Sequence, residues 1–318
     1  MLEILIITTP IFGLIGMGYI AVRTGHFPKA GLGALGAFVV RVALPVLLFK
    51  SISQRSFAEV FNLHYLGAYA LGSVSMLGLG ILWARKLRGQ PLAAASIFGM
   101  GMSCSNSAYV GFPIVLQVIG PSASMALALT MIVENAFMLP LCLAIGESAG
   151  ARHEPFHRAF GRGLYNLRKV PIVIAMVVAF VFSGLHIGLP APAWRAVDML
   201  AAASAPVALF YIGGNLVGLP LRDMLADVSV VTVGKLVLHP LLVFGGLLLF
   251  APVEPHLAVG AVLMASVPML SIYPIFGQRH GQEGFCAATL LVATVLSFVT
   301  IAASIWLLQQ SQVFPLLP

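Results

Sequence analysis

The stretch from Gly99 to Pro113 reads GMGMSCSNSAYVGFP. It lies within a long apolar segment, yet it contains three glycines, three serines and Asn106. A proline removes a backbone donor and clashes with the preceding helical turn. Gly111 and Pro113 therefore predict an interrupted helix. A second apolar segment contains SVPMLSIYP at residues 266–274, so Pro268 and Pro274 predict a second interruption.

The two interruptions occupy corresponding positions of an internal repeat. Four prolines recur 161 residues later: Pro10, Pro45, Pro91 and Pro113 correspond to Pro171, Pro206, Pro252 and Pro274. The side chains agree best where PVLLF at 45–49 matches PVALF at 206–210. Repeats with paired broken helices are typical of secondary transporters, whose site lies near the membrane midplane. Two ordinary proline kinks are the alternative interpretation.

The composition is that of an integral membrane protein. The chain is 60% hydrophobic and 8% charged, whereas a soluble domain carries about 25% charged residues. Because a span needs about 20 mostly apolar residues, we predict ten transmembrane helices. They cover roughly 3–22, 31–53, 64–84, 93–118, 121–147, 168–186, 195–217, 227–250, 257–278 and 285–308. The net charge of +7 is attributed to loops facing anionic lipid, and no nucleic-acid partner is expected.

Basic residues in the loops predict the orientation. With the N-terminus outside, twelve basic residues fall in inside loops and two, Arg55 and Arg195, in outside loops. The inside set is Arg23, Lys29, Arg85, Lys86, Arg88, Arg152, Arg158, Arg162, Arg168, Lys169, Arg222 and Arg279. Both termini are then periplasmic or extracellular. We expect inverted five-helix repeats at 1–147 and 168–318, joined by a polar cytoplasmic linker at 148–167.

Three motifs carry a resemblance to the auxin efflux carrier family. Residues 106–113 match its Asn-x4-Gly-x-Pro element, and Leu44–Phe49 resembles its second span. Val133-Glu134-Asn135 resembles the bacterial members, which include malonate and malate permeases. One departure is that Ser266-Val267-Pro268 stands where plant carriers bring an asparagine near the first proline of the ninth span.

The resemblance implies a fold shared with bile-acid/sodium symporters and sodium/proton antiporters, in which spans 4 and 9 cross at their breaks. Spans 1, 2, 6 and 7 would form a scaffold, often dimeric, and spans 3–5 and 8–10 a mobile transport bundle of the elevator type. The implied substrates are small organic anions: indole acids in plants, and malate- or malonate-like dicarboxylates in bacteria. A bacterial inner-membrane location follows from the same resemblance.

Broken helices expose N–H groups and positive dipole ends that suit a carboxylate. The predicted substrate site lies among these ends. Its residues are Asn106, Ser105, Ser107, Tyr109, Gly111, Ser271 and Tyr273, with Pro113, Pro268 and Pro274 at the breaks. Asn106 is the strongest candidate, because its amide can donate to a carboxylate. Hydrogen bonding between helices is the alternative role for Asn106.

Four ionisable residues within the predicted spans are candidates for coupling. Glu134 could carry a coupling proton, or could be a structural partner of Lys235 or Arg41. For Arg41 and Lys235 we favour extension of the side chain to the membrane surface, and for His239 a hydrogen-bonded core position. Sodium coupling through carbonyls and hydroxyls stays open. No cofactor is expected beyond a proton or sodium ion.

The sequence favours a carrier over an enzyme. His153-Glu154-Pro155-Phe156-His157 fits a zinc pattern that works on a helix, but Pro155 and the polar linker argue against a metal site. No hydrolase elbow, Walker loop or dinucleotide fingerprint is present. The expected partners are an organic anion, membrane lipid and a second copy bound through the scaffold helices. The alternatives are a sodium-coupled bile-acid-type symporter and a membrane sensor or enzyme that does not transport.

Overall fold

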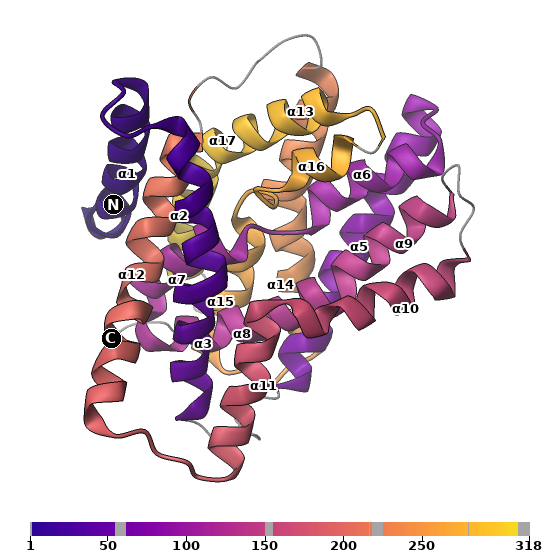
Figure 1. Cartoon of the computed structure of the whole chain (residues 1–318). Helices are drawn as coiled ribbons and strands as arrows, with labels where there is room; N and C mark the ends of the chain where they lie inside the picture. The colour runs from indigo at the N-terminus through magenta and orange to yellow at the C-terminus, as the bar shows by residue number, and fades with distance from the viewer. Residues whose placement is uncertain are drawn as a thin grey trace. The chain divides into compact units, whose positions relative to one another are not determined.

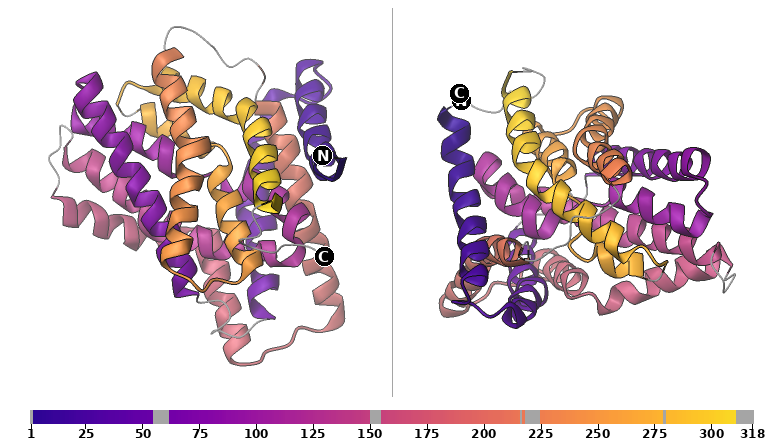
Figure 2. Two further views of the ribbon diagram at one scale, coloured as in Figure 1. Left: turned by 180° about the vertical axis from the view of Figure 1, so that it is seen from behind. Right: turned by 90° about the horizontal axis from the view of Figure 1, so that it is seen from above.

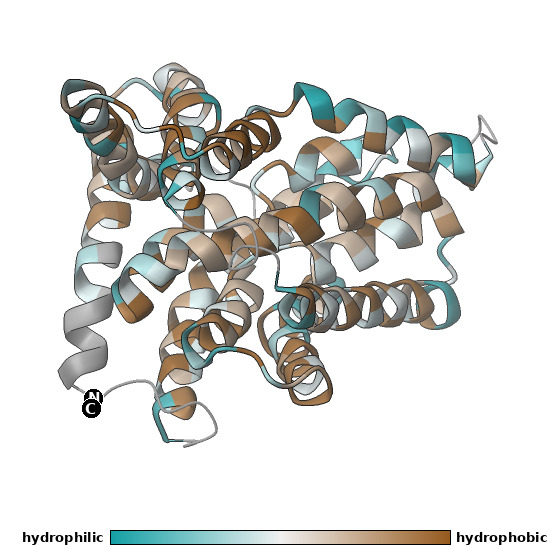
Figure 3. Cartoon of the chain, turned by 90° about the horizontal axis from the view of Figure 1, so that it is seen from below, coloured by the Kyte–Doolittle hydropathy of each residue, from teal (hydrophilic) through white to brown (hydrophobic). Residues whose placement is uncertain are grey.

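The computed structural model describes residues 2–54, 62–149, 155–215, 217, 225–278 and 280–310. In this part of the chain all regular structure is helical, and the one β pairing is an isolated bridge between Ser105 and Met269 (Figure 1). Figure 3 shows hydrophobic residues spread over most of the helices. Helices that are apolar around their circumference belong in lipid or in a large protein core, so the fold is that of an all-helical membrane protein.

Within the described residues, six helices are long and apolar enough to cross a membrane, or seven if a bent pair, Phe156–Lys169 with Pro171–Gly184, forms one span. This count is lower than the ten predicted spans. Three further apolar helices, Gly13–Arg23, Leu92–Ser103 and Pro255–Ser266, are shorter. They coincide with the predicted spans 1, 4 and 9, and the last two end at breaks.

The longest of the six helical stretches cannot be one straight span. It runs from Ser107 to Ser148 over 42 residues, which is about 63 Å of α-helix against a hydrocarbon thickness of about 30 Å. Gly120 has φ +60° and ψ −140°, and Pro121 follows it. Because this backbone conformation is not helical and favours glycine, the helical path is interrupted at Gly120.

The helices pack into two units. The first unit contains the segments before residue 63, those at 108–129 and those at 168–218. Its helical elements are α1 (Leu2–Arg23), η1 (Lys29–Gly31), α2 (Leu32–Phe38), η2 (Val39–Ala43), α3 (Leu44–Ser53), α7 (Phe112–Ile119), η4 (Gly120–Ser122), most of α8 (Ala123–Met131), α11 (Pro171–Gly184) and α12 (Ala191–Asn215). Two short segments, η3 (Ser107–Gly111) and η6 (Leu167–Lys169), lie at the divisions between the units.

The first unit is held together by two long helix pairs, α1 with α12 and α3 with α11. The α1–α12 pair depends on glycine. A Cβ at Gly18 would collide with the backbone oxygen of Phe210, and a Cβ at Gly213 would collide with the backbone oxygen of Ile15. Small residues let membrane helices approach to backbone contact, and this pair uses one glycine from each helix.

The second unit contains α5 (Leu63–Arg88), α6 (Leu92–Ser103), η5 (Ile132–Met138), α9 (Leu139–Ser148), α10 (Phe156–Asn166), α13 (Leu225–Val233), η7 (Gly234–Leu238), α14 (His239–Leu249), α15 (Pro255–Ser266), α16 (Tyr273–Gln278) and α17 (Glu283–Gln310). Elements α13, η7 and α14 run on as one helix, Leu225–Leu249, which Figure 2 shows in orange. Both α14 and α6 pack against α5. The sequence predicted only a polar loop at 148–167, whereas α10 is a helix that packs on α9.

Four π-helical segments, η2, η3, η5 and η7, each precede a proline in the first turn of the next α-helix. Those prolines are Pro45, Pro113, Pro140 and Pro240. A proline inside a helix lacks the N–H and crowds the preceding turn, and a local π turn is one way in which membrane helices accommodate such a disturbance. Pro113 therefore lies within a continuous helical path, and the sequence prediction that it interrupts the helix is wrong.

The structure leaves some of the sequence predictions outside its described residues. These are Arg55, Arg152, Arg222 and Arg279 from the charge count, and His153 and Glu154 from the zinc pattern. The orientation of the termini and the two-repeat domain division stay predictions.

Candidate functional site

Two broken helices of the second unit meet through their backbones. α6 ends at Ser103 and α15 ends at Ser266, and the next residue of each, Cys104 and Val267, is extended. The extended segments form the bridge between Ser105 and Met269. In the same contact the backbone N–H of Asn106 donates to the backbone oxygen of Pro268 at 2.8 Å. We call this contact the crossover. It lies at residues 104–106 and 267–270, before the predicted interruption at Gly111–Pro113.

Asn106 connects the two broken helices a second time. Its side-chain Nδ2 donates to Ser271 Oγ at 2.7 Å. Asn106 is 4% exposed, whereas Ser271 is half-buried. An amide nitrogen carries two N–H donors and the amide oxygen accepts. The asparagine thus places an amide group beside both broken helices.

Glu134, on η5, is buried beside the crossover and accepts from three residues. Its Oε1 accepts from the backbone N–H of Ser105 at 3.1 Å, from Ser107 Oγ at 2.9 Å and from Tyr69 OH at 3.1 Å. Its Oε2 also accepts from Ser107 Oγ at 2.9 Å. Ser107 begins the helical path after the break, where a negative charge is favourable. A protein carboxylate therefore already occupies this helix start, where the sequence predicted the carboxylate of a substrate.

Lys235, on η7, is completely buried and also contacts Ser105. Its Nζ donates to Ser105 Oγ at 2.9 Å and to the backbone oxygen of Ala265 at 2.6 Å. Ala265 lies in the last turn of α15, where a positive charge is favourable. The expectation that Lys235 extends to the membrane surface is wrong, because partners from two other elements hold it inside the unit.

His239 is also buried, one turn after Lys235. Lys235 Nζ lies 3.1 Å from His239 Nδ1, and His239 Nε2 lies 3.0 Å from Ser73 Oγ. Because an ammonium group only donates, Nδ1 is the acceptor, and Nε2 carries the proton and donates to Ser73. His239 is thus a hydrogen-bonded core residue, as the sequence favoured.

The third predicted span, now α5, supplies residues that the sequence analysis missed. Tyr65, Tyr69 and Ser73 recur every four residues and are fully buried. Tyr65 OH lies 2.7 Å from Thr130 Oγ1, and Tyr69 OH lies 3.2 Å from Ser105 Oγ. The sequence pattern that could have identified them is the spacing of three hydroxyl side chains on one face of an apolar helix.

The remaining predicted site residues have other surroundings. Tyr273 OH donates to the backbone oxygen of Ile97 at 2.9 Å and is fully buried. Tyr109, Gly111 and Pro113 belong to the first unit, where Tyr109 OH donates to the backbone oxygen of Gly36 at 2.9 Å. Arg41, also in the first unit, has an exposed side chain on η2.

The second unit thus brings together seven of the predicted residues: Ser105, Asn106, Ser107, Ser271, Glu134, Lys235 and His239. The crossover also includes the backbone of Pro268, and Pro274 is the second residue of the short helix α16. Over the described residues, no group of three His, Cys, Asp or Glu side chains could hold a metal ion.

Several apolar helices and a buried polar crossover are typical of one class of protein, the multi-pass membrane transporters. The model of the membrane transport protein family matches residues 4–306, and the chain belongs to this family. This match confirms the resemblance on which the sequence analysis relied. The chain is accordingly a membrane transporter and not an enzyme.

Three relatives illustrate the range of the family. A protein of Rhizobium meliloti strain 1021 named "Putative malonate transporter" is 31% identical over 97% of each chain. The protein of Escherichia coli K12 named "Uncharacterized transporter YfdV" is 26% identical over 94% of this chain and 95% of its own length. The mouse "Lysosomal cholesterol signaling protein" is 28% identical over 73% of this chain, but over 28% of its own length.

Proposed function

We propose that this chain is a secondary transporter that carries small organic anions by alternating access. Within this class, malonate- or malate-like dicarboxylates are the favoured substrates, and auxin-like acids are the other members considered. The observation that carries the proposal is the crossover, where a buried ammonium and an asparagine amide lie beside two broken helices. The name of the Rhizobium relative supports the same substrate class.

The substrate carboxylate would bind beside Asn106 and Ser271. Ser105 and Ser107 already bond with Glu134 or Lys235, and Tyr273 bonds with a backbone oxygen. These three residues would position the site. The positive charge of Lys235, in surroundings free of bulk water, favours an anion nearby more than it would in water.

The proposed architecture is ten helices in two inverted repeats, 1–147 and 168–318, with the linker 148–167 and the termini on the periplasmic side of a bacterial inner membrane. The paired prolines and the two broken helices support this. Spans 1, 2, 6 and 7 would form the scaffold and the dimer contact, and spans 3–5 and 8–10 the moving bundle. The pairing of α1 with α12 and of α3 with α11 supports a scaffold made from both repeats, because it joins spans 1 and 2 to spans 7 and 6.

Glu134 would carry the coupling proton. Glu134 and Lys235 compensate each other's charge through Ser105. A proton on Glu134 would leave the charge of Lys235 uncompensated, and this would favour the arrival of an anion. Proton and anion would therefore bind together and cross the membrane in the same direction.

Replacing Asn106 tests the substrate site. The assay is uptake of radiolabelled malonate or malate by purified protein in liposomes. We expect Asn106→Ala to reduce uptake about 10- to 100-fold, because the substrate loses one hydrogen bond to its charged group. Asn215→Ala is the matched control, since Asn215 donates to the backbone oxygen of Tyr211 one turn earlier in its own helix. Equal uptake by the wild type and a well-folded Asn106→Ala variant would contradict the site.

Replacing Glu134 tests the coupling. If the proton binds Glu134, uptake by the wild type increases as the external pH falls, and Glu134→Gln makes the rate independent of pH. Glu147→Gln, which breaks a pair with Arg162 at the end of α9, should keep the wild-type dependence. Replacing external sodium by choline should leave uptake unchanged. A requirement for sodium would instead favour the bile-acid-type symporter.

A further inference from the structure

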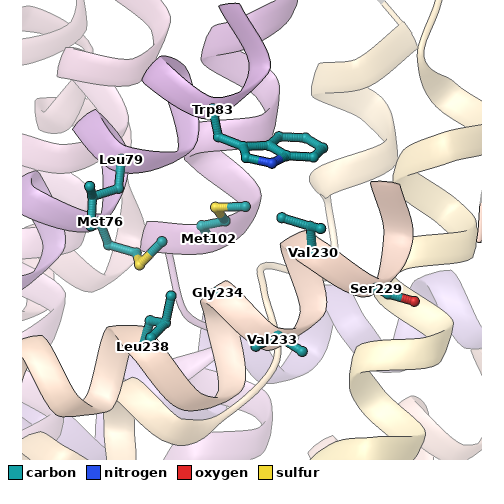
Figure 4. Close-up of a pocket in the computed structure, with 9 residues that line it drawn as sticks. All are labelled: Met76, Leu79, Trp83, Met102, Ser229, Val230, Val233, Gly234 and Leu238. Carbon is teal, nitrogen blue, oxygen red and sulfur yellow. The ribbon is translucent and has the colours of Figure 1, made fainter. Parts of the chain in front are cut away.

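An apolar groove with a volume of about 420 Å³ lies on the second unit. Figure 4 shows the residues that line it: Met76, Leu79, Trp83, Met102, Ser229, Val230, Val233, Gly234 and Leu238. Met76, Met102 and Gly234 are buried and form its floor. Its rim is open, because Leu79, Val233 and Leu238 are 48%, 52% and 44% exposed.

Two helices line the groove along its length. On α5, Met76, Leu79 and Trp83 share one face because their spacings are three and four residues. On the helix Leu225–Leu249, the lining runs from Ser229 to Leu238, about 14 Å along the axis. The floor stays open at Gly234, where a Cβ would come within 2.9 Å of Met102 Sδ. An apolar groove of this length fits a linear hydrocarbon chain.

One end of the groove is basic. Lys86 follows Trp83 by three residues and continues the same face of α5, whereas Arg85 lies in the same last turn on another face. Both side chains are exposed. Arg88 joins α5 to α13 through two contacts with Asp227, Nε to Oδ1 at 2.7 Å and Nη2 to Oδ2 at 3.0 Å. The groove thus leads from hydrocarbon-like side chains to Trp83 and then to the basic last turn of α5.

We propose that this groove is a binding site for one anionic phospholipid. An acyl chain lies between α5 and α13–η7, and the phosphate lies beside Lys86, with Arg85 at the same level of the helix. Tryptophan is the residue preferred at the boundary between hydrocarbon and headgroups. The predicted topology puts this end at the cytoplasmic surface, where anionic lipids attract basic segments. Gly234 precedes Lys235, so the lipid packs on the helical segment that supplies the buried ammonium.

The test is lipid binding by the full-length protein in detergent, measured by native mass spectrometry. The probes are dioleoylphosphatidylglycerol and the zwitterionic dioleoylphosphatidylcholine. We expect one phosphatidylglycerol per chain, held at least tenfold more tightly than phosphatidylcholine. Arg85→Gln with Lys86→Gln should weaken phosphatidylglycerol binding about thirtyfold, since each basic side chain near the surface contributes about 1 kcal/mol and 1.4 kcal/mol is tenfold.

Two further variants separate the headgroup from the acyl chain. Arg158→Gln with Lys169→Gln removes the same charge from exposed positions away from the groove lining and should leave binding unchanged. Val230→Phe narrows the groove and should weaken the binding of both lipids by a similar factor. Melting temperatures in lipid-free detergent verify that each variant folds, and the single variant Lys86→Gln replaces the double variant if the latter does not.

Three results would overturn the proposal. The first is equal affinity for the two phospholipids. The second is binding that neither the basic-end variant nor Val230→Phe changes. The third is occupation by something else, seen either as retention of cholesterol in preference to phosphatidylglycerol or as a cross-link from the Leu79→Cys variant to a second copy of the chain.

Discussion

A single serine connects the two buried charges of the crossover. The backbone N–H of Ser105 donates to Glu134 Oε1 at 3.1 Å, and the Ser105 hydroxyl accepts from Lys235 Nζ at 2.9 Å. Tyr69 OH lies 3.2 Å from the same hydroxyl oxygen. Charges buried in protein are tolerated when they are paired and hydrogen-bonded. The stability of this region therefore depends on keeping both charges or losing both.

A double-mutant cycle tests this dependence at the scale of single residues. Lys235→Met leaves Glu134 without its compensating charge, and we expect a loss of about 3–5 kcal/mol, as for other broken buried pairs. Adding Glu134→Gln should recover a large part of that loss. The measurement is the melting temperature in detergent, with Lys169→Met as the exposed control. A double variant less stable than Lys235→Met alone would contradict the pairing.

At the scale of elements, glycines decide how closely helices approach. Gly213 on α12 faces the backbone oxygen of Ile15, so that even one methyl group collides with main chain. Gly16 lies one residue further along α1, and a methyl group there would meet no other atom within 4 Å. Replacing glycine by alanine should therefore have opposite effects on stability at positions 213 and 16 of this helix pair.

We expect Gly213→Ala to lower the melting temperature strongly, because α1 and α12 must separate and overpacking costs about 1–3 kcal/mol or more. Gly16→Ala should be neutral or slightly stabilising, since alanine forms helices better than glycine by about 1 kcal/mol. Thermal unfolding of the two purified variants in one detergent makes the comparison. A Gly213→Ala protein as stable as Gly16→Ala would show that the helices are further apart.

For the whole molecule, local signals in the sequence predicted more than pairings across the chain. Asn106 and the presence of a break in each of the two segments were evident because prolines and polar residues in an apolar segment are unusual, although the first break does not lie at Pro113. The burial of Lys235 was not evident. A lysine near the end of a predicted span can reach the surface, and only Ser105, 130 residues away, and Ala265 show that it does not.

The prediction for Pro113 failed for a related reason. A proline disrupts a helix through the carbonyl of the preceding turn, and the effect depends on whether that turn can widen. The structure widens it as η3, and the break falls earlier, at residues 104–106. Nothing in the sequence of one segment specifies which solution is used. The break coincides with the pairing of Ser105 with Met269, which follows the other broken helix.

The π turns before prolines have a consequence for the faces of these helices. A π turn holds about one residue more than an α turn, and one residue corresponds to a rotation of about 100°. The helix face that points into the protein before η5 or η7 is therefore different from the face that points inward after it. A helical-wheel projection drawn straight through Glu134 or Lys235 would assign half of each helix to the wrong environment, so the two halves should be plotted separately.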